Sequence, residues 1–340
     1  MTALLELKGV TKTFGKGRAI TVALDDMTLA VNDDFPHIVS IAGESGSGKT
    51  TIAMLLLGFY APTRGHVLYR GQDIHKLSGS QRYSFRKEVQ AVFQDPFAVY
   101  NPFYKVDNLL SIPIQNFRLA KNKQEAHALM EQALIHVGLR PEETLGRYPH
   151  QLSGGQRQRI AVARALILRP KLLITDEPVS MVDASLRATL LKLLRALNQE
   201  LEMPILYITH DLTTAYHISD YIVILYHGSV MEAGNVDVII KDPKHPYTQL
   251  LVASIPWPDP NRSWGETKQV FPTGTMFDEY APGCKFSLRC PFAGEICRDE
   301  RPPLYRLDDG RVVACRHFES GEALAGMDLG TLFARKGQAP

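Results

Sequence analysis

The chain has 340 residues, of which 45% are hydrophobic and 22% charged, and its formal net charge is +2. These values are typical of a globular protein with one or two domains, and without a polybasic or acidic block they identify no nucleic-acid partner. The N-terminus lacks the apolar core of a secretory signal, and about 18 uncharged apolar residues never run together. We therefore expect a cytoplasmic chain, with peripheral attachment to a membrane protein left open.

The first motif in chain order is GESGSGKT at residues 43–50, between the apolar runs HIVSIA and TIAMLLLGF. These runs predict a strand before the motif and a helix after it. Small residues let backbone N–H groups approach a polyphosphate, and the helix start adds its positive end. Lys49 is placed to reach the β- and γ-phosphates, and Thr50 to bind Mg²⁺. The predicted nucleotide-binding residues are Gly43, Glu44, Ser45, Gly46, Ser47, Gly48, Lys49, Thr50 and Thr51.

The region from about 95 to 150 has a different character. NKQEAHALMEQALIHVG predicts a helix that ends at Gly138, and no strong strand pattern lies near it. We interpret about 95–160 as a helical insertion into the surrounding domain.

A second glycine-containing helix start follows in LSGGQRQR at 152–159. Ser153 can cap the helix, and Gly154 and Gly155 permit close backbone approach, with Gln156 completing the motif. One nucleotide does not need two anion-binding helix starts on one chain. The pattern therefore suggests that this second start completes the nucleotide pocket of another subunit.

The apolar run LLITDEP ends in two adjacent carboxylates, Asp176 and Glu177. Open α/β sheets bind ligands at such strand ends. Asp176 fits a role in organising Mg²⁺, and Glu177 fits the base that orients or deprotonates the attacking water.

Strand and helix patterns alternate through the central chain, which indicates an α/β domain with a mostly parallel sheet. Strands are predicted at 37–42, 171–176 and 204–210. A leucine-rich helix starts near Asp183, which can cap it, and 221–234 predicts a hairpin turning at His227-Gly228.

A Pro-rich linker that includes IPWPDPNRSW leads to a small region that holds all four cysteines, Cys284, Cys290, Cys297 and Cys315. Cytosolic thiols stay reduced, which disfavours disulfides. Zinc sites usually pair cysteines two to four residues apart, whereas a four-thiolate [4Fe–4S] site accepts the wider C-x5-C-x6-C-x17-C spacing. An iron–sulfur cluster, zinc and unligated thiols all stay open at this point.

The three motifs together resemble the ATP-binding subunit of an ATP-binding cassette (ABC) transporter, for which LSGGQ is the signature. The resemblance covers residues 4 to about 235 and implies a P-loop NTPase (RecA-like) core that uses ATP and Mg²⁺. It implies that Gln94 senses Mg²⁺ and faces the membrane subunits, and that His210 contacts the γ-phosphate. It also implies that Asp183 lies in a loop crossing a dimer interface and that Phe14 stacks on adenine.

Two departures from the family pattern leave every catalytic group in place. Met181-Val182 stand where Ala-Leu is usual, and Thr175 stands where an aliphatic residue is common. We therefore expect competent hydrolysis with altered packing at the dimer interface.

The C-terminal part resembles the extension of the oligopeptide/dipeptide importer branch, through HPYTQLLVASIP and CKFSLRCPFAGEIC. FQDPFAVYNP resembles that branch's glutamine-loop neighbourhood, with Tyr100 replacing a leucine. The branch also includes carriers of oligosaccharides and nickel chelates, and members with these four cysteines are thought to hold a [4Fe–4S] cluster. We expect an ATPase domain at 1–235 and, at 236–340, an irregular extension with the cluster on Cys284, Cys290, Cys297 and Cys315.

The resemblance also implies partners. We expect a second ABC ATPase chain, a different one forming a heterodimer although a homodimer is not excluded. Two transmembrane permease subunits and an extracytoplasmic substrate-binding protein complete the assembly, with this chain at the inner face of the cell membrane. The competing hypotheses are a soluble ABC ATPase of translation or repair and a regulatory iron–sulfur protein with a vestigial ATP site. The single cassette, the lack of a long heptad run and the complete catalytic set argue against them.

Overall fold

The computed structural model describes residues 3–15, 20–33, 35–95, 100–255, 282–307, 310–324 and 327–329. The chain forms two compact units, one made of residues 1–76 and 208–340 and the other of residues 77–207. The predicted boundary at 235 stays a prediction, and the expected linker IPWPDPNRSW lies outside the described residues apart from Ile255.

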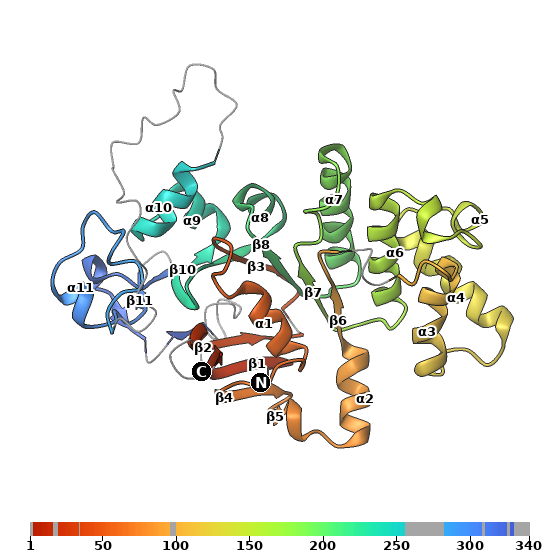
Figure 1. Cartoon of the computed structure of the whole chain (residues 1–340), viewed down its shortest axis with the longest axis horizontal. Helices are drawn as coiled ribbons and strands as arrows, with labels where there is room; N and C mark the ends of the chain where they lie inside the picture. Colours follow the sequence, from red (N-terminus) through yellow and green to blue (C-terminus); the bar gives the residue numbers. More distant parts are fainter. Residues whose placement is uncertain are drawn as a thin grey trace, which may run out of the picture. The chain divides into compact units, whose positions relative to one another are not determined.

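The first unit contains a sheet that the sequence patterns did not predict (Figure 1, where β1, β2, β4 and β5 are red to orange). Its order is β14-β2-β1-β4-β5, antiparallel except for the β14–β2 pair. The strands span β1 (Leu5–Phe14), β2 (Thr21–Val31), β4 (Arg64–Tyr69), β5 (Gln72–Asp73) and β14 (Met327–Asp328). Leu5, Leu7 and Val10 of β1 are fully buried, so one face of this sheet contributes to the core.

A second sheet in the same unit carries the phosphate loop. Here β3 (Ile38–Ala42) pairs in parallel with β9 (Tyr221–Tyr226), which forms an antiparallel hairpin with β10 (Ser229–Asn235). The predicted hairpin is confirmed. Its turn residues His227 and Gly228 have φ values of 44° and 76°, the left-handed pair that suits a tight hairpin.

The C-terminal extension continues this second sheet. From β10 outward the order is β12 (Val312–Val313), β11 (Tyr305–Arg306) and β13 (Glu322–Ala323), with Glu232 of β10 opposite Val313. Tyr247 and Phe286 of the extension pack into the same apolar cluster as Ile222, Ile224 and Met231 of the hairpin. The extension therefore shares a hydrophobic core with the strands that hold the phosphate loop.

The first unit also contains short helices (Figure 1). They are α1 (Lys49–Leu56), η1 (Ile74–Lys76), α8 (Leu212–Ile218), α9 (Val236–Lys241), α10 (Pro246–Ala253), α11 (Ile296–Asp299) and η3 (Arg316–Phe318).

The second unit is mainly helical around the parallel pair of β6 (Val89–Val92) and β7 (Leu172–Asp176). Its helices are α2 (Gly79–Glu88), α3 (Val106–Asn116), α4 (Lys123–His136), α5 (Pro141–Thr144), η2 (Pro149–Gln151), α6 (Gly154–Leu166) and α7 (Ala184–Glu200). Helices α3 and α4 pack on α6. The predicted helical insertion at about 95–160 stays a prediction in its bounds. β8 (Ile205–Thr209) then leads the chain back to the first unit.

Two predicted helix caps have different outcomes. Ser153 caps α6 with its side chain, as predicted. Asp183 occupies the N-cap position of α7, but the prediction that its side chain caps the helix is wrong, since it accepts no capping hydrogen bond.

In the described part of the chain, no helix is both long enough and apolar enough to cross a membrane.

Candidate functional site

The phosphate loop lies between β3 and α1 and is closely confined on two sides. A Cβ atom on Gly48 would lie 2.2 Å from the carbonyl oxygen of Ala23, and one on Gly43 would lie 2.1 Å from that of Leu225. Gly48 also has a φ of 103°, and Gly46 one of 80°. Both conditions require glycine, so these residues fix the loop's path rather than loosen it.

Lys49 directs its ammonium group back into this loop. Its Nζ donates to the carbonyl oxygens of Gly43 at 2.8 Å and Glu44 at 2.7 Å, and it lies 3.4 Å from Oγ of Ser47. The side chain is buried, whereas Ser45, Gly46 and Thr50 are exposed. A positive charge thus lies inside a loop whose outer side is open, an arrangement suited to a phosphate group.

The β9–β10 turn supports the loop from within the same unit. The N–H of Gly228 donates to the carbonyl of Ser47 at 2.9 Å, and the N–H of Asp25 donates to the carbonyl of Gly228 at 3.0 Å. One hairpin turn therefore links the loop to β2.

Sequence reasoning missed two further contacts with the loop. The N–H of Glu44 donates to the Tyr247 hydroxyl at 3.0 Å, and the Arg289 guanidinium bonds both carboxylate oxygens of Glu44, the nearer at 3.1 Å. Both residues lie in the motifs that carried the importer resemblance, HPYT and SLRCP. The sequence interpretation used the cysteines there and overlooked the arginine beside Cys290.

The predicted adenine contact, Phe14, ends β1 and is 36% exposed. Its ring meets that of Tyr60 edge to face at 5.3 Å, and Nζ of Lys12 lies 4.9 Å from the Phe14 ring centroid. An accessible aromatic ring held by neighbours is suited to stacking. The role itself stays a prediction.

His210 follows β8 and is exposed, next to a well-formed helix start. The Asp211 carboxylate accepts the N–H of Thr213 at 2.8 Å and thereby caps α8. His210 thus occupies a fixed position at a strand end, and its γ-phosphate contact stays a prediction.

The second unit carries the acidic pair at the end of β7. Asp176 is buried, and Glu177 has a left-handed φ of 47°. Its carbonyl accepts the Ser180 hydroxyl at 3.0 Å. Thr175, an unusual residue for this position, is accommodated because its hydroxyl donates to the Leu206 carbonyl at 3.4 Å.

The signature turn before α6 forms a complete capping box. Oγ of Ser153 accepts the N–H of Gln156 at 3.2 Å, and Oε1 of Gln156 accepts the N–H of Ser153 at 2.9 Å. A Cβ atom on Gly155 would lie 2.9 Å from Cδ1 of Leu186. The turn therefore packs against the start of α7, and Ser153 itself is exposed.

The segment around Gln94 is tied to the signature helix. Gln94 is exposed, and the carbonyl of its neighbour Phe93 accepts Nε2 of Gln158 at 3.3 Å. The Tyr100 hydroxyl donates to the Arg157 carbonyl at 2.8 Å, a bond that leucine at this position could not make. The structure thus brings Phe14, Lys49 and His210 into one unit, and Gln94, Ser153 and Glu177 into the other.

The expected [4Fe–4S] site is wrong. All four cysteines are free thiols that line one pocket, but the described residues hold no group of three or more His, Cys, Asp or Glu placed to bind a metal ion. Burial raises the pKa of the Cys284 thiol to about 12 and that of Cys315 to about 11. Cys284 and Cys290 instead pack against the apolar cluster that includes Phe286.

Comparison with known proteins matches both parts of the chain. A family described as "ABC transporter" matches residues 24–180, and "Oligopeptide/dipeptide transporter, C-terminal region" matches residues 231–297. The putative oligopeptide transport ATP-binding protein YkfD of Bacillus subtilis is 37% identical over 94% of this chain and 97% of its own. The oligopeptide transport ATP-binding protein OppF of Escherichia coli is 36% identical over 88% and 89%.

A solved structure shows the same fold. The dimeric, post-hydrolysis state of the ATP-binding cassette MJ0796, bound to ADP and Pi, has a TM-score of 0.60 and 29% identity to this chain. The match covers 68% of this chain and 98% of that one.

Proposed function

The chain belongs to the ATP-binding subunits of ABC transporters, in the oligopeptide/dipeptide branch, and from this membership we propose that it hydrolyses ATP to power peptide import. Subunits of this kind act with membrane permeases and a substrate-binding protein. The observation that carries the proposal is the phosphate loop, in which Gly43 and Gly48 leave no space for side chains and the buried lysine amine points into the loop.

ATP and Mg²⁺ fit the residues of this chain. We propose that the loop N–H groups and Lys49 hold the phosphates, and that Thr50, Gln94 and Asp176 hold Mg²⁺. The metal would neutralise charge on the phosphate oxygens. Phe14 would stack on the base, and His210 would contact the terminal phosphate. Glu177 would orient the attacking water and accept its proton.

The signature turn is proposed to act on a nucleotide held by a second chain. Ser153, just before α6, is exposed, and the described residues of its own unit include no phosphate loop. The related cassette MJ0796 is described as dimeric with ADP and Pi bound, which supports this arrangement. We propose that the partner is a different ATPase chain of the same family.

We further propose that the assembly lies at the inner face of the cell membrane, with the surface near Gln94 facing the permeases. Closure of two chains on two ATP molecules would pull on the permeases, and hydrolysis would release them. ATP favours the closed state because its γ-phosphate makes contacts only there.

The Glu177→Gln variant tests the hydrolytic role. The assembly, purified from detergent-solubilised membranes, should bind ATP as before while its hydrolysis rate falls at least about a hundredfold, since the proton acceptor is lost. Glu200→Gln, at the exposed end of α7 in the same unit, is the matched control and should hydrolyse ATP at the parental rate. Parental turnover by Glu177→Gln would overturn the assignment of the base.

A further inference from the structure

The C-terminal extension contacts the phosphate loop at one residue, Glu44, through two different side chains. We propose that Arg289 and Tyr247 are positioning residues for ATP binding, so that the extension is part of the nucleotide machinery of the first unit. This inference rests on the proposed ATPase function and adds residues outside the nucleotide-binding motifs to it.

Glu44 is bonded through three separate groups. Its N–H donates to the Tyr247 hydroxyl, its carboxylate pairs with Arg289, and its carbonyl oxygen accepts Nζ of Lys49 at 2.7 Å. The first two bonds come from the extension, and the third comes from the lysine predicted to bind phosphate. A change in how the extension holds Glu44 therefore changes the surroundings of the Lys49 amine directly.

Arg289 is itself held in place by aromatic rings. Its guanidinium carbon lies 5.8 Å from the ring centroid of Tyr226 and 5.6 Å from that of Phe286, and Nη1 lies 3.4 Å from the Tyr226 hydroxyl. Two of its nitrogens reach the Glu44 carboxylate. Because the planar guanidinium is fixed before it meets the carboxylate, little side-chain entropy is lost in forming the pair.

Tyr247 is positioned by the start of α10. Nδ1 of His245 accepts the N–H of Tyr247 at 3.0 Å and caps this helix. Burial lowers the pKa of His245 to about 3, so the imidazole is neutral at physiological pH and remains able to accept this bond. Tyr247 is fully buried, and its hydroxyl reaches the loop.

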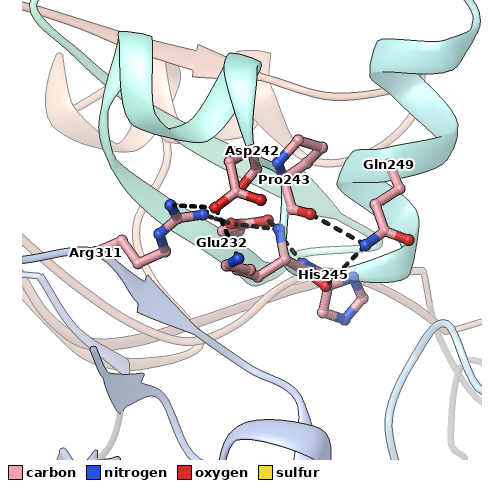
Figure 2. Close-up of polar contacts among 7 residues, drawn as sticks. Glu232, Asp242, Pro243, His245, Gln249 and Arg311 are labelled. Carbon is pink, nitrogen blue, oxygen red and sulfur yellow. Dashed lines mark hydrogen bonds and ion pairs between the residues drawn. The ribbon is translucent and has the colours of Figure 1, made fainter. Parts of the chain in front are cut away.

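A buried carboxylate, Glu232 of β10, anchors the segment that leads into α10 (Figure 2). It accepts the N–H groups of Lys244 at 3.0 Å and His245 at 2.9 Å, and it pairs with Arg311 of the extension at 3.2 Å. Arg311 also donates to the carbonyl of Asp242. The residues that lead into α10 are thus held by Glu232 of the hairpin and by Arg311, a later residue of the extension.

The proposal follows from this continuous set of contacts. Arg311 and Glu232 hold the segment before α10, α10 presents Tyr247, and Tyr247 and Arg289 together hold Glu44. A C-terminal extension without these contacts would not be connected to the phosphate loop. The extension is placed to set the conformation in which the loop receives a phosphate.

The test measures ATP affinity and turnover separately in the full chain, assembled with its membrane partners. Arg289→Ala should raise the KM for ATP roughly fivefold and leave kcat within about twofold, as expected for a partly exposed two-bonded charge pair. Arg289→Lys keeps the positive charge but loses the contact of two guanidinium nitrogens with the Glu44 carboxylate, and it should recover part of the ATP affinity. Arg316→Ala, which removes the ion pair with Glu300 within the extension, is the matched control and should leave KM unchanged.

A double-mutant cycle identifies the contact. If Arg289 acts through Glu44, the double variant Glu44→Ala with Arg289→Ala should have nearly the KM of the more impaired single variant. Tyr247→Phe removes only the acceptor of the Glu44 N–H, and should raise KM by a smaller factor with only a small fall in the unfolding midpoint. It provides an answer even if Arg289→Ala does not fold.

The outcomes separate this inference from the proposed function. A parental assembly without ATPase activity overturns the proposed function. An active parental assembly, with unchanged KM in Arg289→Ala and Tyr247→Phe, overturns only the positioning role. An equal rise of KM in Arg316→Ala also overturns it, because the effect would then be a general consequence of loosening the extension.

Discussion

The chain has two glycine-containing turns that each precede a helix, and the two are built differently. The loop before α1 has left-handed glycines, a lysine amine turned back onto its own carbonyls, and contacts from a hairpin turn and the C-terminal extension. The turn before α6 has an ordinary capping box and an exposed serine. The first forms a nearly complete anion site from its own unit, whereas the second is a helix end that we propose to act on a nucleotide held by another chain.

This difference supports different roles for the two turns. A loop that must enclose a phosphate needs backbone conformations that only glycine adopts, and it needs neighbours that hold them. A turn that only touches a nucleotide across an interface needs an open approach and a stable helix behind it. We therefore propose that the two turns differ in how far their roles depend on residues of their own unit.

The difference between the two turns is tested most directly by adding one methyl group to each. Gly48→Ala would place Cβ 2.2 Å from the Ala23 carbonyl at a φ of 103°, so we expect nucleotide affinity to fall by more than about a hundredfold. Gly154→Ala would meet only the Met181 carbonyl, at 3.7 Å, and single-chain affinity should stay within about twofold. Equilibrium binding of a fluorescent ATP analogue measures both, and similar losses would show that the turns are not distinct.

A second prediction concerns the support beneath the first loop. Arg311→Met leaves the Glu232 carboxylate buried without its cation, and should lower the free energy of unfolding by roughly 2–3 kcal/mol. Two N–H donors remain on Glu232. Burial raises the pKa of Glu232, which makes its protonation easier. The loss of unfolding free energy should therefore lie at the low end of what removing one partner of a buried ion pair costs. Urea unfolding of the purified chain measures it.

The control for this prediction is an exposed ion pair in the second unit. Arg140→Met removes a contact with Glu143 in which both side chains are more than half exposed, and it should cost under about 1 kcal/mol. Equal losses in the two variants would mean that the Glu232–Arg311 pair does not anchor the extension.

Much of the first loop could be predicted from sequence because its determinants are local. The spacing of Gly43, Gly48 and Lys49 specifies a strand, a tight loop and a helix start within about ten residues, and Ser153 with Gln156 likewise specifies a capped helix. Local hydrogen bonds and glycine conformations follow from neighbouring residues, and these predictions are confirmed.

The rest could not be predicted because its determinants are distant in sequence. Arg289 meets Glu44 across 245 residues, and nothing in their local patterns pairs them. The cysteines were misinterpreted for a related reason, because their spacing along the sequence does not determine where the four thiols lie in the fold. Asp183 stands at a helix start as predicted, yet the position alone did not determine its side-chain bond.

The smallest predicted effect concerns the second turn. Two serine capping boxes lie among the described residues of the second unit. Ser153 caps α6 and Ser78 caps α2, each with a glutamine three residues later. Either serine-to-alanine change should cost about 1 kcal/mol in thermal unfolding, since each removes one capping bond. Only Ser153→Ala should also slow ATP hydrolysis by the assembled transporter, by about tenfold, because only that hydroxyl is proposed to face a partner's nucleotide. Equal ATPase rates in the two variants, at equal loss of stability, would show that Ser153 acts only as a helix cap.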